Sequence, residues 1–250
     1  MLVDTHAHIH FDDFSDDVLS AAKAAGVEKI VTIGVDAADS AKAVEFAQAH
    51  DNVYATVGLH PHDAKHGNEA AQAQLSKLAG ESKVVAIGEC GLDFYRNLSD
   101  KHSQEKTFRY QIELAQKNNL PMVWHVRDAF DEFFKIVDEY SGLRGIVHCF
   151  TSNRANMEKA IERGFMVALN GIMTFTRDES QLNAAKNLPL SNLVLETDCP
   201  FLTPVPLRGK PNQPAYIKFT AEFLAKLRAE SFEELAEASS SNAVRLLRLT

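Results

Sequence analysis

The sequence predicts an α/β fold, a (β/α)8 TIM barrel formed by residues 1–250 as a single domain. The length of 250 residues is the usual length of such a barrel. Short apolar runs alternate with segments of helical periodicity along the whole chain. Histidine and acidic residues follow many of these runs, at the strand ends where barrels of this kind carry their active sites.

Eight apolar runs are expected to form the strands. Two of them, residues 84–87 and 193–195, are continuously apolar, as parallel strands buried on both faces are. The strands are expected near residues 1–8, 29–35, 53–60, 84–89, 121–126, 145–149, 165–171 and 193–198.

Helical patterns separate these runs. The alanine-rich residues 21–25 are followed by Gly26, and glycine commonly ends a helix. Phe108, Ile112 and Ala115 recur at the spacing of one helical face. The helices are expected near residues 15–25, 37–49, 69–80, 101–118, 129–140, 153–163 and 179–187, with two more near 215–229 and 231–248.

The composition limits where the protein acts and what it binds. No apolar run approaches the roughly 20 residues that cross a bilayer, so no membrane association is expected. Three cysteines without CxxC spacing indicate reduced thiols, so a cytoplasmic protein is expected. No exposed apolar repeat suggests an interface, so we expect a monomer. The net charge of −8 argues against a broad basic surface, and any nucleic acid would be recognised locally.

Six potential metal ligands follow the predicted strands, and in a barrel the carboxyl ends of the strands converge on one mouth. Four imidazoles and two carboxylates exceed the four ligands of a closed structural zinc site and suit two divalent ions, Mg²⁺, Mn²⁺ or Zn²⁺. A water shared by two cations readily becomes a hydroxide nucleophile. Hydrogen-bonded core histidines are the alternative. The predicted ligands are His6, His8, Glu89, His125, His148 and Asp198.

Two of these carboxylates are also predicted to be catalytic. Glu89 is expected to bridge the two ions, because the fourth strand lies across a barrel from His6 and His8. Asp198 is expected to bind one ion and to orient or deprotonate the attacking water, although an aspartate before Pro200 also suits a helix cap. Glu196 is expected to orient a ligand histidine.

Several short motifs carry a family resemblance that spans nearly the whole chain. In order they are Asp4-Thr5-His6-Ala7-His8, Gly58-Leu59-His60-Pro61-His62, Gly88-Glu89-Cys90-Gly91-Leu92-Asp93, His125-Val126-Arg127-Asp128-Ala129, His148-Cys149-Phe150, Leu195-Glu196-Thr197-Asp198, Arg208-Gly209-Lys210-Pro211-Asn212 and Asn242-Ala243. Together they resemble the TatD family of metal-dependent deoxyribonucleases, within the amidohydrolase-like superfamily. The resemblance implies a (β/α)8 fold, the same six metal ligands and phosphodiester hydrolysis, typically 3′ to 5′ on DNA. Gln213 stands where many members have Glu.

Four residues are predicted to bind substrate: Arg127, Arg208, His60 and His62. A guanidinium two residues after His125 suits a phosphate oxygen, with a salt bridge to a nearby aspartate as the alternative. Arg208 lies in the loop after the last strand, where barrels often bind phosphate. His60 and His62 are expected at the end of the third strand. They could contact substrate or neighbouring carboxylates, with a purely structural role as the alternative. Aromatic residues near the mouth could stack on bases: Phe94, Tyr95, Phe150, Phe175 and Phe201.

The leading functional prediction is a divalent-metal-dependent phosphodiesterase, a deoxyribonuclease of the 3′–5′ exonuclease type acting on single-stranded DNA ends. Its nucleophile would be a metal-activated hydroxide at a dinuclear site. The alternative enzyme is a metal-dependent esterase or amidohydrolase acting on another substrate, such as D-aminoacyl-tRNA or a lactone. A barrel that binds metal and a partner without catalysis would be expected to have lost a ligand, and this chain keeps all six.

Overall fold

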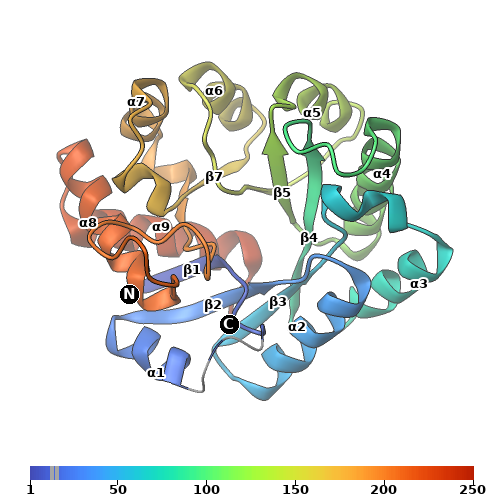
Figure 1. Ribbon diagram of the computed structural model, residues 1–250, viewed down its shortest axis with the longest axis horizontal. Helices are drawn as coiled ribbons and strands as arrows, with labels where there is room; N and C mark the ends of the chain where they lie inside the picture. The colour runs from blue at the N-terminus through green and yellow to red at the C-terminus, as the bar shows by residue number, and fades with distance from the viewer. Residues whose placement is uncertain (12–13, 15–16) are drawn as a thin grey trace. The chain divides into compact units, whose positions relative to one another are not determined.

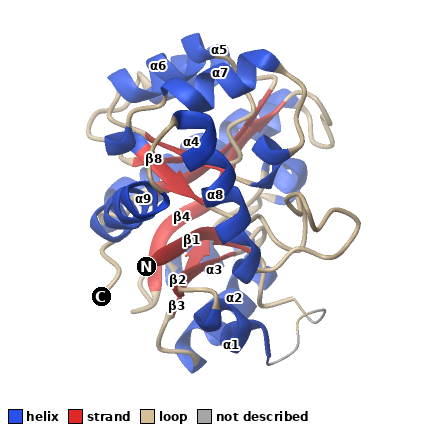
Figure 2. Cartoon of the chain, turned by 90° about the vertical axis from the view of Figure 1, so that its left-hand side faces the viewer, coloured by secondary structure: helices blue, strands red, loops and turns tan. Residues whose placement is uncertain are grey.

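The computed structural model describes residues 1–11, 14 and 17–250, and its strands form one eight-stranded sheet in the order β1 to β8. The pairings β1–β2, β3–β4, β4–β5, β5–β6 and β7–β8 are parallel. The strands, labelled in Figures 1 and 2 where there is room, are β1 (Leu2–Ala7), β2 (Val27–Ile33), β3 (Val53–Val57), β4 (Val84–Asp93), β5 (Met122–Arg127), β6 (Gly145–Val147), β7 (Met166–Leu169) and β8 (Leu193–Leu195).

A helix follows each strand along the chain. Those expected at 37–49, 101–118 and 179–187 have the predicted bounds, and residues 15 and 16 of the first expected helix lie outside the described residues. The α-helices are α1 (Asp17–Ala24), α2 (Ala37–Ala49), α3 (Glu69–Leu78), α4 (Lys101–Asn118), α5 (Phe130–Val137), α6 (Arg154–Glu162), α7 (Glu179–Asn187), α8 (Ile217–Arg228) and α9 (Phe232–Leu247). Short 3-10 helices, not expected from the sequence, are η1 (Pro61–His66), η2 (Gly171–Thr174), η3 (Leu190–Asn192) and η4 (Pro214–Tyr216).

The strand prediction was wrong at two ends that matter for the site. Strand β4 was expected to end at Glu89 but continues four residues further, to Asp93. Strand β8 was expected to reach Asp198 but ends at Leu195. Glu89 therefore lies inside a strand, whereas Asp198 lies in the connection that follows one.

The chain divides into two compact units, the first formed by Met1–Thr32 with Cys149–Thr250 and the second by Ile33–His148. In the first unit the start and end of the sheet lie side by side. An isolated parallel bridge joins Ala7 to Cys199, and the backbone N–H of His8 donates to the carbonyl of Cys199. Together with the strand order, this pairing is that of a (β/α)8 barrel, so the predicted fold class is confirmed.

Helix α9 packs against β1 and β8 within the first unit. Its apolar face is buried, including Leu235, Ala243 and Leu247. The side-chain amide of Asn242 donates to the carbonyls of Leu190 and Leu193, at distances of 2.7 and 2.9 Å. This side chain therefore satisfies backbone acceptors at the entry to β8 and fixes where that strand begins.

The second unit has an aromatic core beneath α4 and α5. The ring of Phe133 on α5 packs edge to face on Trp124 of β5, with centroids 5.5 Å apart, and stacks on Phe108 of α4 at 5.9 Å. All three side chains are fully buried. Aromatic pairs of this geometry stabilise a core beyond the area that they bury.

Among the described residues, no helix is long and apolar enough to cross a membrane. The prediction of a single domain over residues 1–250 stays a prediction, as do the monomeric state and the cytoplasmic location.

We expect Phe133→Ala to lower the free energy of unfolding by about 3–5 kcal/mol, because it leaves a cavity between Trp124 and Phe108. Urea unfolding followed by far-UV circular dichroism measures the change. Phe130→Ala, the same substitution at a half-buried position of the same helix, is the control and should cost clearly less. Equal losses at the two positions would contradict this account of the core.

Candidate metal centre

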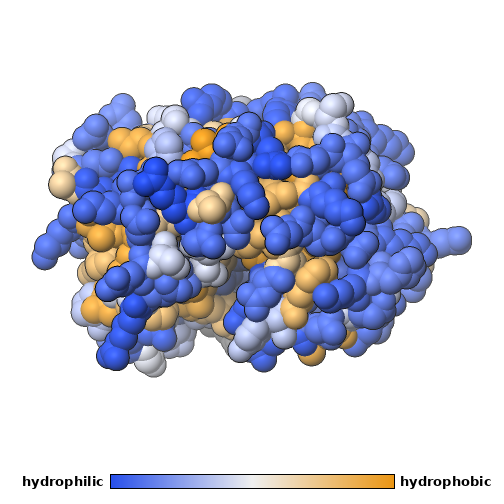
Figure 3. Space-filling view, turned by 90° about the horizontal axis from the view of Figure 1, so that it is seen from above, coloured by the Kyte–Doolittle hydropathy of each residue, from blue (hydrophilic) through white to orange (hydrophobic). Residues whose placement is uncertain are grey.

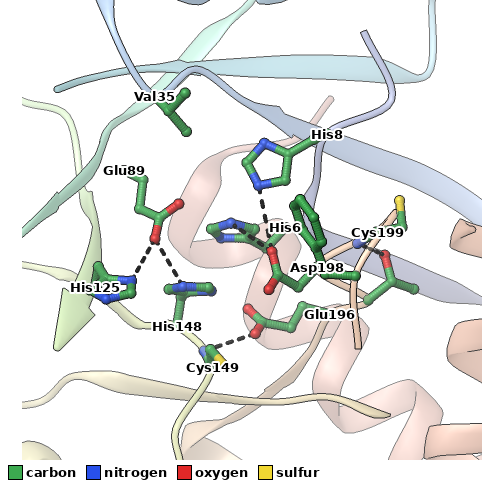
Figure 4. Close-up of polar contacts among 12 residues, drawn as sticks. His6, His8, Val35, Glu89, His125, His148, Cys149, Glu196, Asp198 and Cys199 are labelled. Atoms are coloured by element: carbon green, nitrogen blue, oxygen red, sulfur yellow. Dashed lines mark hydrogen bonds and ion pairs between the residues drawn. The ribbon is translucent and has the colours of Figure 1, made fainter. Parts of the chain in front are cut away.

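A first ligand group, His6, His8 and Asp198, lies in the first unit. His6 is on β1 and His8 directly follows it, so alternation along the chain gives both rings the same direction. The Nε2 atoms of both histidines lie 3.5 Å from Oδ1 of Asp198, as Figure 4 shows. One ligand atom from each of the three residues lies within 4.8 Å of the other two, a spacing that fits a single ion. Both rings are buried.

The backbone holds Asp198 in this place. Its N–H donates to the carbonyl of His6 at 2.8 Å, and its own carbonyl accepts from Phe201 at 2.9 Å. Its φ of 56° is in the left-handed region, which costs energy for a residue with a Cβ but which aspartate tolerates better than most. Strain of this kind is typical of functional positions, where the surrounding structure has to impose it.

Asp4 joins the two chain segments that carry this group. Its carboxylate accepts from the hydroxyl of Thr197 at 2.6 Å and from the backbone N–H of Thr197 at 2.9 Å. Burial raises the pKa of Asp4 to about 7, although the hydrogen bonds from Thr197 act in the opposite direction. The sequence motif that contains Asp4 does not reveal this role, because the partner lies 193 residues away.

A second ligand group, Glu89, His125 and His148, lies in the second unit. Oε1 of Glu89 is 2.8 Å from Nδ1 of His125 and 3.0 Å from Nε2 of His148 (Figure 4). Glu89 comes from the middle of β4, His125 from β5, and His148 directly follows β6. Three neighbouring strands therefore deliver one carboxylate and two imidazoles to one point.

His60 also lies against the carboxylate of Glu89. Its Nδ1 accepts the backbone N–H of His62 at 3.1 Å, so a neutral ring carries its proton on Nε2. That Nε2 is 3.3 Å from Oε1 of Glu89. Burial lowers the pKa of His60 although Glu89 acts to raise it, which favours this neutral form. His60 is therefore suited to donate to Glu89 and fix its orientation.

Asp93 is the site residue that sequence reasoning missed. It is fully buried, and its Oδ2 is 3.0 Å from Nε2 of His125 and 2.9 Å from Nε2 of His62. Its Oδ1 accepts the backbone N–H of Arg96 at 2.7 Å. Burial alone would raise the pKa of Asp93, but the hydrogen bonds from His125, Arg96 and His62 outweigh it and lower the pKa. The spacing Glu89-x-x-x-Asp93 was a usable signal, because residues four apart on a strand share a face.

His125 thus has a carboxylate oxygen at each ring nitrogen. Burial lowers its pKa, but the hydrogen bonds to Asp93 and Glu89 outweigh that effect and raise it. When Nε2 donates to Asp93, Nδ1 directs a lone pair at Glu89, and two acceptors 2.8 Å apart need a cation or a proton beside them. A metal-binding histidine whose other N–H donates to a carboxylate is the common arrangement in metalloenzymes. The donor set of the second ligand group therefore fits a divalent ion.

The two arginines predicted to bind substrate share one feature. The guanidinium of Arg127 lies over the ring of Tyr95, and that of Arg208 over Phe175, each 3.9 Å from the ring centroid. Arg208 also donates to the carbonyl of Thr203 at 2.8 Å. An aromatic ring holds a guanidinium in place through one face and leaves its N–H edges available for hydrogen bonding.

Glu196 was expected to orient a ligand histidine, and that role stays a prediction. Its Oε1 accepts the backbone N–H of Cys149 at 2.8 Å and the side-chain amide of Asn170 at 2.9 Å, the former drawn in Figure 4. It thus holds the backbone that follows β6, next to a predicted ligand, through a main-chain contact that residue spacing does not reveal.

Comparison with known proteins identifies the family. The family model described as TatD related DNase matches residues 3–248. The chain belongs to the TatD family. An uncharacterized metal-dependent hydrolase of Bacillus subtilis, YabD, is 40% identical over the full length of both chains. The 3′-5′ ssDNA/RNA exonuclease TatD of Pectobacterium carotovorum is 36% identical, over 96% of this chain and 95% of the relative.

A solved structure agrees with this membership. The crystal structure of YJJV, a TatD homologue from Escherichia coli, superposes with a TM-score of 0.92 at 29% identity, over 100% of this chain and 98% of that one. The predicted fold and the predicted enzyme class, a metal-dependent hydrolase acting on ester bonds, are thereby confirmed. The number of ions and the roles of the individual ligands stay predictions.

We expect Asp93→Asn to weaken divalent metal binding by about 10- to 100-fold, because an amide cannot be a full anionic acceptor for His125 and His62. Isothermal titration of metal-free protein with Mn²⁺ measures the affinity. Asp51→Asn removes the same charge from an exposed turn and is the control. Unchanged Mn²⁺ affinity in Asp93→Asn would show that Asp93 has no part in orienting the ligands.

Proposed function

We propose that this chain is a divalent-metal-dependent 3′–5′ exonuclease that shortens single-stranded DNA ends. The observation that carries the proposal is the presence of two ligand groups, each combining imidazoles with a carboxylate, on strands of one sheet. Each predicted ligand lies on a strand or in the connection that follows one, and parallel strands of a barrel have their carboxyl ends at the same edge. We propose that the two groups hold two ions that act on one phosphate.

The ions, Mg²⁺, Mn²⁺ or Zn²⁺, would supply a nucleophilic hydroxide and offset the charge that builds up on the phosphate. The chain's own residues have separate tasks. Asp198 orients the attacking water and accepts its proton, since its carboxylate lies between two imidazoles in the first ligand group. Glu89 lies against His60, His125 and His148, and the Nε2–H of His60 is suited to hold its carboxylate in one orientation.

A phosphodiester suits the charged groups of this chain better than a neutral ester. The net charge of −8 leaves no broad attraction for nucleic acid, and hydrophilic residues cover much of the face in Figure 3. Arg127 and Arg208 are cations whose guanidinium planes are already fixed by aromatic rings. Guanidinium forks match phosphate oxygens in geometry, so these two residues are proposed to hold the substrate's phosphates. The naming of similar proteins as single-strand exonucleases supports the same substrate.

We expect Asp198→Asn to lower kcat on single-stranded DNA by about 10²- to 10⁴-fold, because the variant loses the acceptor of the water proton. Metal-free protein is restored with Mg²⁺, Mn²⁺ or Zn²⁺ separately and given oligonucleotides labelled at the 5′ end. Stepwise shortening from the 3′ end is expected for the unchanged protein and for Asp51→Asn.

Metal content, measured by mass spectrometry on the same samples, separates lost chemistry from lost ions. The outcome that contradicts the proposal is intact DNA together with rapid cleavage of D-aminoacyl-tRNA or a lactone. That result would keep the hydrolase and assign it to the alternative substrates.

A further inference from the structure

Tyr95 and Arg127 form an exposed pair beside the second ligand group. Of the five aromatic residues expected near the mouth, Phe150 is buried, and the rings of Phe94 and Phe175 are half-buried beneath Lys101 and Arg208. Phe201, in the first unit, is 55% exposed, and Tyr95 is the exposed ring of the second unit. Tyr95 remains 59% exposed even with a guanidinium over its ring. An exposed aromatic ring near a buried polar site leaves a face on which a flat group of a ligand can stack.

The pair is anchored to the same two strands that carry Asp93 and His125. In the β4–β5 register Asp93 stands opposite Arg127, and the N–H of Phe94 donates to the carbonyl of Arg127 at 2.9 Å. Tyr95 follows two residues after Asp93, and the hydrogen bond from the N–H of Arg96 to Asp93 turns the chain at that point. The backbone that carries Tyr95 and Arg127 is therefore held close to that of the ligand histidine, because strand hydrogen bonds connect β4 and β5 at this end.

The chemistry of the pair indicates what binds there. A guanidinium that lies flat on a ring keeps its N–H edges directed outward, where they suit phosphate oxygens. The exposed aromatic surface suits a second flat, electron-rich group, and nucleobases stack on aromatic rings and on guanidinium planes alike. The pair of side chains thus offers an edge for the backbone of a nucleic acid and a face for its base.

We propose that Tyr95 and Arg127 form a stacking platform for the nucleobase next to the scissile phosphate, an inference that rests on the proposed nuclease function. A base inside a duplex has both faces covered by its neighbours and cannot reach such a platform. The pair therefore selects unpaired ends, and it does so without preference among the bases because every base has a π-face.

Tyr95→Ala, Tyr95→Phe and Leu98→Ala test the platform. Leu98 is a 56% exposed apolar residue three positions further along, so its variant controls for the loss of exposed apolar surface. Each variant is given a single-stranded oligonucleotide and a matched one whose last two 3′ nucleotides carry a tetrahydrofuran instead of a base. Melting temperature and metal content are measured on every variant.

On the normal oligonucleotide, Tyr95→Ala is expected to lower kcat/KM by about tenfold, within the range measured for stacking of one base on an aromatic ring. Tyr95→Phe and Leu98→Ala should keep most of the activity. On the oligonucleotide without terminal bases, the unchanged protein should be slower, and Tyr95→Ala should lose nothing further.

Equal losses by Tyr95→Ala on both oligonucleotides, or no loss on either, would overturn the platform while leaving the nuclease in place. An unchanged protein that binds its metal but shortens neither oligonucleotide would overturn the proposed function and the platform with it. The two failures are therefore distinguishable by the behaviour of the unchanged protein.

Discussion

The arrangement of the second ligand group depends on the buried contacts of His125 with two carboxylates. Burying a carboxylate is costly unless hydrogen bonds or a cation compensate, and here Glu89 and Asp93 are both buried. Asp93 receives N–H groups from two imidazoles and one backbone amide, which stabilises its negative charge. Because His125 is oriented through Asp93, the nitrogen that faces Glu89 has only one direction in which to bind a cation.

The backbone of the second unit is shaped to allow these contacts. Gly88 and Gly91 flank Glu89 and have φ values of 147° and 134°, which residues with a Cβ rarely adopt. A Cβ on Gly91 would lie 2.2 Å from the carbonyl oxygen of His125, and one on Gly88 would lie 2.4 Å from that of Val123. Both glycines let β4 run directly against β5 at the point where the ligands meet. The aromatic core around Phe133 lies under the same two strands and supports them.

An acidic chain that acts on a polyanion needs attraction only where the chemistry occurs. In the first unit a guanidinium lies over Phe175, and in the second unit another lies over Tyr95. In each case an aromatic neighbour reduces the freedom of a long flexible side chain, so less entropy would be lost if it bound a phosphate, as proposed. Bound cations would add to the local positive potential. In the proposed nuclease, specificity for unpaired ends would come from the exposed ring of Tyr95, and affinity would come from a few charges.

The sequence by itself determined the fold class, the bounds of several helices and the family. Strong periodicity defines α2, α4 and α7, and the motifs along the chain are short enough to recognise without coordinates. It also placed His6 and His8 on one face of a strand, since alternation requires no tertiary contact. The continuation of β4 beyond Glu89 through Gly91 was missed, because glycine within a predicted strand usually indicates its end or a bulge.

Only the tertiary structure decided which groups support the predicted ligands. Asp4 meets Thr197 across 193 residues of sequence, Asp93 meets His62 and His125 on two other segments, and Glu196 holds a backbone N–H. Such partners are chosen by the register between strands and by burial, which makes an unpaired polar group costly. Neither property can be deduced from local residue patterns, because each depends on segments that come together only when the chain folds.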